Sequence, residues 1–419
     1  MSEVPENNSR QNSSSSGTSG LPQGIVDRIM ENVGNMSERS QSEPRKSPLP
    51  DFLVPHIMLT RMSERVGKWA HAKISRKESA PEEATKERAT LSKITDMLID
   101  PKKIFAVVRL KLVDELGTFL VSHDPFIREK TAIAISEIAR RPTGRQAIIR
   151  NPTILSNLIN GLQDVVIDVR IQMARVLEIL AHDYFSAKVL VENYRFLDII
   201  AQSLSREQRE ILVNKNININ IYSFFSFFIY KCVTDAHHLC QIIYLSSLEV
   251  LLLAHVNVCH AIEIDMIETL LGLLNYHKRD KELLGKVLSC LVLLCQDSLG
   301  TWKAFEVKNF LSILTPLLND DAKEIHEKAA SLIAFATITN YGKINGLIFI
   351  DRLLELANNG LSRECRLMSI KALTNIAEVP EGREELLAHL IFIEHINTGR
   401  DRVLKKHKNI LLKVIQWHP

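Results

Sequence analysis

The sequence predicts an all-α protein, a right-handed α-solenoid of about seven helical units, and three observations support this prediction. Only 16 Gly and 14 Pro occur among 419 residues, too few for the many turns of a β-sandwich or β-barrel. Hydrophobic residues make up 46% of the chain and aromatic residues only 6%, so Leu, Ile, Ala and Val supply most of the apolar surface. The chain also repeats with a period of 41 to 42 residues, which indicates an array of helical units.

The first part of the chain predicts no packed unit. Residues 1–50 are rich in Ser, Asn, Glu and Pro, a composition with too little apolar surface to offset the entropy of ordering, so we expect a disordered tail. A short amphipathic piece inside it predicts either a linear motif for a partner or a transient helix; its apolar residues are Ile25, Ile29, Val33 and Met36. Residues 51–84 mix apolar and charged side chains and form a poorly defined lead-in. The beginning shows no secretory signal, and we expect a cytoplasmic protein.

The repeat spans residues 85–400. When residues 127–163 are set over residues 169–205, apolar and small residues coincide at an offset of 42. A residue that ends a helix, with apolar residues three and four before it, can be followed along the chain: Met97, Ala139, Ala181, Ala254, Cys295, Ala336 and Ala377. The steps between these anchor residues are 42, 42, 73, 41, 41 and 41 residues. Small anchor residues let one helix approach the next closely, and one step is too long.

The long step contains an atypical insertion, residues 213–241. Its sequence NININIY, residues 216–222, alternates Asn and Ile, a strand pattern inside a helical array. Three interpretations stay open: a surface insertion, a functional loop, or an artefact of translation through an intron. The functional interpretation depends on four side chains of the insertion that could bind zinc, although their spacing is not an established one; they are Cys232, His237, His238 and Cys240.

No enzyme signature occurs in the chain: the phosphate-binding, dinucleotide-binding, nucleophile-elbow and metalloprotease motifs are all missing. We therefore predict no enzyme, no cofactor, no metal and no small-molecule substrate. The six cysteines show neither CxxC pairs nor a disulfide framework and are expected to be reduced. Cys290 and Cys295 lie in a strongly apolar helix and are predicted to be core thiols.

Charge concentrates at the C-terminal end. The whole chain carries only +3, which indicates neither nucleic acid nor an anionic membrane as a partner. Residues 401–419 predict a basic capping helix with an apolar face of Val403, Leu404, Leu411, Leu412 and Ile415. Two interpretations stay open for its basic side: a solvated surface, or a docking site for an acidic protein such as tubulin, an anionic lipid or a nucleic acid. The weak candidates for partner binding are Arg400, Arg402, Lys405, Lys406 and Lys408.

A solenoid also exposes an elongated concave face on which peptides bind. We expect this face on the last helix of each unit, near residues 153–163, 195–205, 265–275, 309–319 and 349–359. The three tryptophans, Trp69, Trp302 and Trp417, lie outside these segments, so the pattern is not that of a nuclear-import receptor.

The repeat resembles the armadillo family over roughly residues 85–400. A narrower resemblance, in residues 87–108 and 120–148, is to the armadillo proteins of the radial spoke head in the axoneme of motile cilia and flagella. The residues that carry it are Arg88, Ala89, Leu91, Asp96, Asp100, Pro101, Asp124, Ile127, Arg128, Lys130, Thr131, Gly144 and Arg145. The N-terminal extension and the insertion depart from that family.

The resemblance implies a non-enzymatic protein-binding scaffold, a structural component of the radial spoke whose partners are other spoke or axonemal subunits. The alternative is a soluble armadillo adaptor that binds a peptide partner in transport or signalling.

Overall fold

In the computed structural model, which describes residues 82–218, 224–276 and 280–417, every regular element is a helix. The chain forms two compact units, residues 1–134 and 135–419. The sequence therefore predicts the all-α class correctly. The amphipathic piece with Ile25, Ile29, Val33 and Met36, the lead-in before residue 82, and Trp69 lie outside the described residues.

The first unit contains α3 (Glu82–Met97), α4 (Pro101–Arg109), α5 (Leu112–Thr118), η3 (Phe119–Val121) and the beginning of α6 (Pro125–Ala139). Several residues of the narrower resemblance start or hold these helices. Asp100 caps α4 by accepting a hydrogen bond from the Lys102 amide at 2.9 Å, and Pro101 follows at the first helical position. Asp124 caps α6 and forms an ion pair with Arg88 at 2.6 Å. These residues thus have structural roles.

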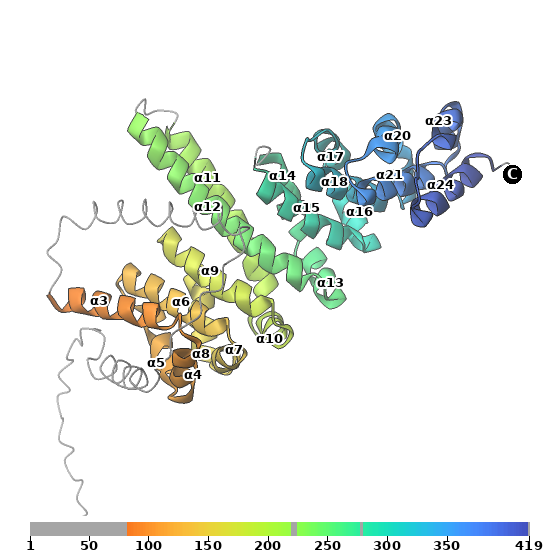
Figure 1. Cartoon of the computed structure of the whole chain (residues 1–419). Helices are drawn as coiled ribbons and strands as arrows, with labels where there is room; N and C mark the ends of the chain where they lie inside the picture. Colours follow the sequence, from red (N-terminus) through yellow and green to blue (C-terminus); the bar gives the residue numbers. More distant parts are fainter. Residues whose placement is uncertain (1–81, 219–223, 277–279, 418–419) are drawn as a thin grey trace, which may run out of the picture. The chain divides into compact units, whose positions relative to one another are not determined.

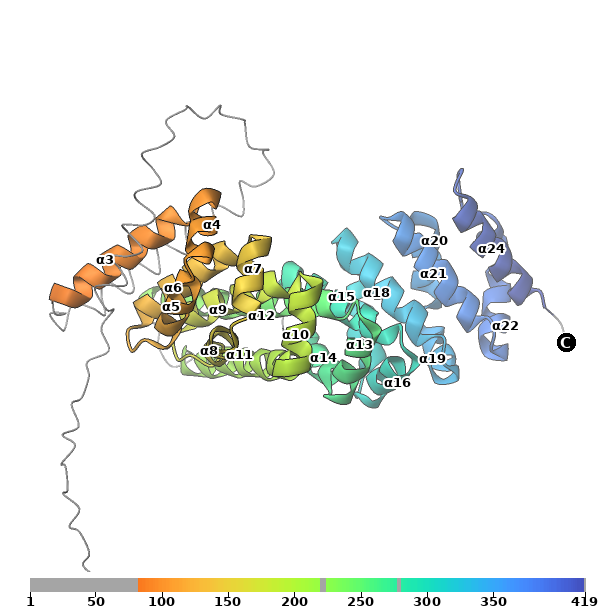
Figure 2. The same cartoon turned by 90° about the horizontal axis from the view of Figure 1, so that it is seen from below.

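The second unit repeats a group of three helices, whose first, second and third members we call the short, medium and long helix, and Figures 1 and 2 show their succession. Two medium helices depart from this name in length: α11 has 23 residues and α23 has 5. The short helices are α7 (Pro142–Ile149), α10 (Tyr184–Tyr194), α13 (His255–Glu263), α16 (Ser298–Glu306), α19 (Asn340–Asn345, extended by η4, Gly346–Phe349) and α22 (Pro380–Ala388). The medium helices are α8 (Pro152–Gly161), α11 (Phe196–Asn218), α14 (Met266–Tyr276), α17 (Phe310–Leu318), α20 (Ile350–Asn359) and the brief α23 (Leu390–Glu394). The long helices are α9 (Ile167–Ala181), α12 (Phe224–Leu251), α15 (Lys281–Cys295), α18 (Lys323–Ala336), α21 (Arg363–Ile376) and α24 (Arg402–Ile415).

The long helices form the layer that holds the second unit together. Each one packs on the next, from α9 through α12, α15, α18 and α21 to α24. Small residues such as Ala174, Ala329 and Ala372 are fully or almost fully buried in this layer, which allows close approach of the helix backbones. The segments that we expect to form the concave, peptide-binding face lie in the medium helices and not in this layer of long helices. They pack on one another less extensively, and the position of a concave face stays a prediction.

Glycine marks the junction between a long helix and the following short one. At four junctions a glycine lies against the backbone carbonyl six residues earlier, so close that a Cβ atom would overlap the oxygen. The pairs are Gly144 with Ile138, Gly300 with Leu294, Gly342 with Ala336, and Gly382 with Ile376. The following Arg145 and Arg383 each donate a hydrogen bond from the guanidinium to the carbonyl that ends the long helix, Ala139 O and Ala377 O, both at 3.2 Å.

Five of the seven predicted anchors are the last residue of a helix, Ala377 follows the end of α21 as its C-cap, and Ala254 does not end a helix. Ala181, Cys295 and Ala336 are the last residues of α9, α15 and α18. Ala254 is wrong as an anchor: it is exposed and precedes α13 as its N-cap, whereas α12 ends at the buried Leu251. The predicted anchor lies three residues beyond the end of α12 because Leu251 takes the place that a small residue holds in the other units.

The insertion lengthens a helical hairpin. Helix α11 runs on to Asn218 and α12 begins at Phe224, and the two pack side by side (Figure 1). The strand-like alternation does not give a strand in residues 216–218, which are helical; residues 219–223 lie outside the described part. Extending a helix that is already packed costs less free energy than starting a new element, which explains why the Ile-Asn alternation is overridden.

Candidate functional site on the last helix, and the charge cluster under the hairpin

Helix α24 carries most of the predicted partner-binding residues. Its apolar side, Leu404, Leu411 and Ile415, is buried against the preceding helices. Two residues of the predicted apolar face depart from this: Val403 is 40% exposed and Leu412 is half-buried. Asp401 caps the helix by accepting hydrogen bonds from the Val403 and Leu404 amides at 2.8 and 3.1 Å.

The exposed side of α24 is a basic face, which we define as Arg402, Lys405, Lys406 and Lys413. At 100° per residue these four side chains fall within about 100° of the helix circumference. All four are exposed, and none makes a hydrogen bond or ion pair with another described residue. The one acidic group of the segment, Asp401, is paired with Arg363, which lowers the pKa of that carboxyl. The basic face therefore carries an uncompensated positive charge.

The two remaining predicted residues behave differently from each other. Arg400 is exposed in the turn before α24 and has no partner among the described residues. Lys408 points the other way and donates hydrogen bonds from Nζ to the carbonyls of Glu394 and Ile396, at 2.7 and 3.1 Å. Lys408 thus caps the end of α23 and belongs to the fold, a role that a count of charges cannot show.

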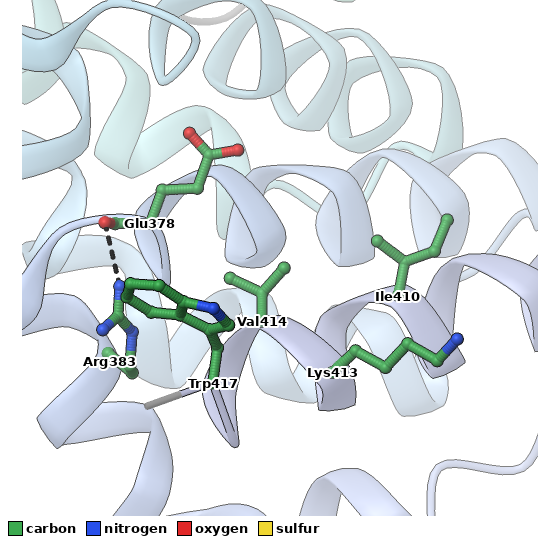
Figure 3. A pocket seen from close by; sticks show the side chains of 6 residues that line it. All are labelled: Glu378, Arg383, Ile410, Lys413, Val414 and Trp417. Carbon is green, nitrogen blue, oxygen red and sulfur yellow. Dashed lines mark hydrogen bonds between the residues drawn. The ribbon is translucent and has the colours of Figure 1, made fainter. Parts of the chain in front are cut away.

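A shallow pocket of about 390 Å³ borders the basic face. Figure 3 shows its lining, in which the Trp417 indole lies over the Arg383 guanidinium; the guanidinium carbon is 5.0 Å from the ring centroid. Arg383 is held by the carbonyls of Ala377 and Glu378, while Trp417 is 55% exposed. The end of the second unit therefore offers basic groups beside an aromatic and apolar edge, a combination suited to an acidic peptide with an apolar side chain.

A second set of exposed apolar residues lies on and beside the short helices, and sequence reasoning missed it. Its members in the middle of the second unit are Tyr184, Phe185, Leu253, Val256, Leu299, Trp302, Ile338, Tyr341 and Ile344. Many of them stand at the beginning of a short helix, three to five residues after an anchor, so their recurrence was detectable in the repeat. Exposed apolar side chains mark an interaction site where they form a contiguous patch, whereas single ones are ordinary on a protein surface.

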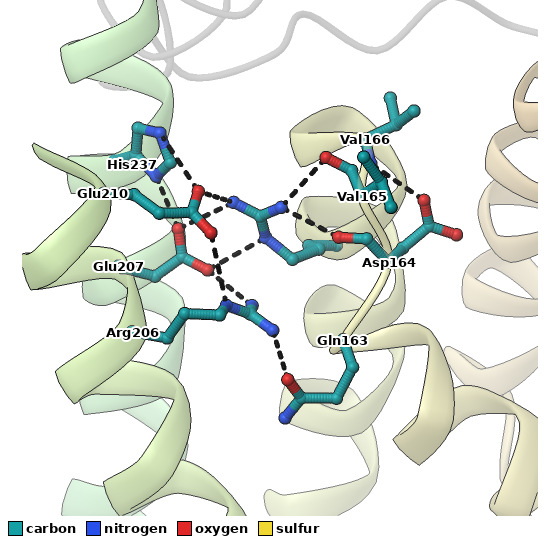
Figure 4. Close-up of polar contacts among 9 residues, drawn as sticks. Gln163, Asp164, Val165, Val166, Arg206, Glu207, Glu210 and His237 are labelled. Atoms are coloured by element: carbon teal, nitrogen blue, oxygen red, sulfur yellow. Dashed lines mark hydrogen bonds and ion pairs between the residues drawn. The ribbon is translucent and has the colours of Figure 1, made fainter. Parts of the chain in front are cut away.

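A buried charge cluster lies where the hairpin of α11 and α12 leaves the repeat (Figure 4). Arg170 on α9 forms ion pairs with Glu207 at 2.9 Å and Glu210 at 2.8 Å, and Arg206 pairs with Glu207 at 2.7 Å. His237 on α12 lies 2.5 Å from Glu207 through Nδ1. Burial would raise the pKa of Glu207, but hydrogen bonds from His237 and Arg170 outweigh it and lower that pKa to about 2. Because an ionised carboxylate only accepts, Nδ1 of His237 is the donor.

The positions of the histidines and cysteines of the insertion show whether they could bind zinc together. His237 is directed to Glu207, Cys240 is fully buried beside Tyr244, and His238 pairs with Asp280 at 3.4 Å. The predicted ligands therefore do not converge; the Cys232 side chain lies outside the described residues. Glu207, Glu210 and His237 do approach one another, but Arg170 and Arg206 already supply the positive charge there.

Most thiols are core groups, as predicted for Cys290 and Cys295. Cys240, Cys290, Cys295 and Cys365 are buried, and burial raises the pKa of Cys295 to about 12 and that of Cys365 to about 11. They are protonated at neutral pH and unreactive. Cys259 differs, because it is partly exposed on α13.

No protein-family profile matches the sequence. An engineered protein of known crystal structure is 16% identical and aligns over 81% of this chain and 97% of its own, with a TM-score of 0.41. A designed armadillo repeat protein is also 16% identical, over 73% of this chain and all of its own, with a TM-score of 0.36. The helices of the second unit recur in groups of three at intervals of about 42 residues, a spacing within the range of armadillo and HEAT arrays. None of the described helices is both long and apolar enough to cross a membrane.

Proposed function

We propose that this protein is a non-enzymatic scaffold that docks other proteins, and that its partner at the C-terminal end presents an acidic surface. The observation that carries the proposal is the uncompensated basic face of α24 beside the pocket of Trp417. Complementary charge steers such a partner and selects it against neutral ones, while the apolar edge supplies contact area. Arg400 extends the positive charge to the turn before the helix.

The setting that we propose is the radial spoke of motile cilia or flagella, as in the radial spoke head 14 homologue. Support comes from the sequence resemblance around Asp100, Asp124, Arg128 and Arg145. A stack of long helices suits a structural part of the axoneme, because each unit is held by its neighbours and keeps fixed spacings between bound partners.

Fractionation of ciliated cells tests this setting. The tagged protein would be expressed in a ciliated or spermatogenic line, and proteins that co-purify from salt-extracted axonemes and from cytosol would be compared by mass spectrometry. Radial spoke subunits in stoichiometric amounts in the axonemal fraction are the expected result. A wholly cytosolic pool with another partner would favour the soluble adaptor and remove the axonemal assignment.

A variant separates docking by α24 from assembly through other surfaces. Lys405→Glu combined with Lys406→Glu reverses two exposed charges that make no contact within the described residues. Loss of this variant from the axonemal fraction, with unchanged helicity, would place the acidic partner on α24. Retention at the level of the unmodified protein would exclude α24 as the docking element.

A further inference from the structure

Three side chains with metal-binding atoms meet on the second unit, away from α24 and from the charge cluster. His255 is the first residue of α13, Cys259 follows one turn later on the same helix face, and Asp297 is the N-cap of α16. Nε2 of His255 lies 3.3 Å from Oδ2 of Asp297, and Nδ1 of His255 lies 3.8 Å from Sγ of Cys259. One ligand atom from each residue can be chosen so that all lie within 4.8 Å of one another.

These three groups are free to bind a cation. Oδ1 of Asp297 accepts the Leu299 amide at 2.8 Å, which fixes the carboxylate and leaves Oδ2 directed to His255. No Lys or Arg among the described residues pairs with Asp297. Ligand atoms of Glu207, Glu210 and His237 also lie within 4.8 Å of one another, but two guanidinium groups occupy the carboxylate oxygens. The carboxylates of Glu207 and Glu210 are therefore already neutralised by guanidinium groups, whereas Asp297 has no such partner among the described residues.

The geometry fits zinc. Zinc binds imidazole nitrogen and carboxylate oxygen at about 2.0–2.1 Å and thiolate sulfur at about 2.3 Å, so a tetrahedral site separates N from O by about 3.3 Å and N from S by about 3.6 Å. The observed distances of 3.3 and 3.8 Å involve different nitrogens of His255. The His255 side chain is 76% exposed, so its ring can turn to present a single nitrogen to the ion.

We propose that His255, Cys259 and Asp297 form a zinc site with three protein ligands and a fourth position for water or for a ligand from a partner. A thiolate and a carboxylate balance the charge of Zn²⁺, and mixed sulfur, nitrogen and oxygen ligands favour zinc over magnesium or calcium. The Cys259 thiol releases its proton when the metal binds, so the apparent affinity rises with pH. The site lies among the exposed Leu253, Val256 and Leu299, where an open position faces a potential partner surface.

Metal binding by the full-length, tag-free chain tests the proposal. The protein would be stripped with a chelator and titrated with Co²⁺ to record the thiolate-to-cobalt charge-transfer absorption, and with Zn²⁺ in competition with a coloured chelator. One ion per chain is the expected stoichiometry. The site variants are His255→Ala, Cys259→Ser and Asp297→Asn, the last of which keeps an N-cap residue of equal quality.

Each site variant is expected to lower the affinity for Zn²⁺ by at least about a hundredfold, since removal of even outer-shell groups costs 10- to 100-fold. Cys259→Ser should also abolish the charge-transfer absorption. The control is His395→Ala, an exposed histidine whose ring forms a hydrogen bond with the Ile391 carbonyl, and circular dichroism would verify folding of every variant. Absence of binding, or binding that the three site variants leave unchanged, would overturn the proposal.

Discussion

At the residue scale, the glycines between long and short helices are the positions where a single methyl group matters most. A Cβ atom at position 342 would overlap the carbonyl oxygen of Ala336 and touch the Phe305 ring. Gly272, in contrast, lies in α14 with nothing near the place of a Cβ atom. The same substitution should therefore have opposite effects at the two sites.

We expect Gly342→Ala to lower the free energy of unfolding by about 1–3 kcal/mol, because the helix junction must open to admit the methyl group. Gly272→Ala should raise it by about 0.5–1 kcal/mol, because Ala reduces the entropy of the unfolded chain in a helix interior. Urea denaturation followed by circular dichroism measures both. Equal effects at the two positions would contradict the close packing of the junction.

Glu207 makes stability depend on pH. Its pKa is about 2 in the folded protein against an ordinary value of 4.5, so protonation favours the unfolded chain. The contribution of this carboxylate, about 3 kcal/mol, is complete above about pH 5 and is lost as the pH falls towards 2. Glu207→Gln should thus be strongly destabilising at pH 7, where it leaves Arg170 short of a partner, and much less so near pH 3.

Denaturation of the unmodified protein and of Glu207→Gln across this pH range tests the prediction, because the difference between their unfolding free energies reports on Glu207. Other carboxyl groups with lowered pKa values, such as Asp198 and Asp320, affect both proteins alike and cancel. If the two unfolding free energies differed by the same amount at pH 7 and at pH 3, the contacts with Arg170 and His237 would not lower the pKa of Glu207.

At the scale of elements, the lysines of α24 have two different roles. We expect Lys405 and Lys406 to bind a partner, whereas Lys408 stabilises the fold. Lys405→Glu/Lys406→Glu should leave the melting temperature within a few degrees and weaken binding of a glutamate-rich peptide, because both side chains are exposed and pair with no residue that the structure describes. Lys408→Glu should lower the melting temperature, because it removes the donors to Glu394 and Ile396. Fluorescence anisotropy at several salt concentrations measures binding. A salt-independent affinity would exclude charge as its source.

The hairpin of α11 and α12 contains the inserted residues 213–241, and their presence in the natural protein can be tested. His237 and Cys240 belong to residues 213–241, and both are buried in the second unit. We predict that the natural protein contains this segment, since its end completes the cluster around Glu207. Tryptic digestion should release a peptide of residues 216–231, at a yield equal to other peptides. If it is missing from protein isolated from its natural source, the translated-intron interpretation holds.

At the scale of the whole molecule, stability belongs to neighbouring units together. Ala174 is 2% exposed within α9, between α8 and α12. Ala174→Asp would bury an unpaired charge and should unfold the adjacent units, with a loss of helicity larger than one helix. Asn193→Asp, which adds the same charge at an exposed position of α10, is the control. Unchanged helicity and melting of Ala174→Asp would refute the register of the repeat.

Much of the fold was predictable from the sequence because the repeat is a periodic pattern of apolar and small residues. Spacing and composition indicate helices, their order and most of the ends of long helices, including Ala181, Cys295 and Ala336. Ala254 failed because the pattern assumes a small residue at each helix end. The alternation near residue 217 gives no strand because these residues continue a helix that is already packed. Exposed charge on α24 was also foreseeable, since amphipathic spacing shows which side faces solvent.

Contacts between residues distant in sequence were not foreseeable, because no short-range pattern encodes them. Lys408 differs from Lys405 only through carbonyls that α23 places beside it. The cluster of Arg170, Glu207 and His237 joins three helices, and its members look in the sequence like ordinary solvated charges. The meeting of Cys259 with Asp297 likewise follows from the packing of α13 and α16. Periodicity thus specifies the helices and their order, whereas the chemistry of the surface arises where separate helices bring polar atoms within a few ångströms.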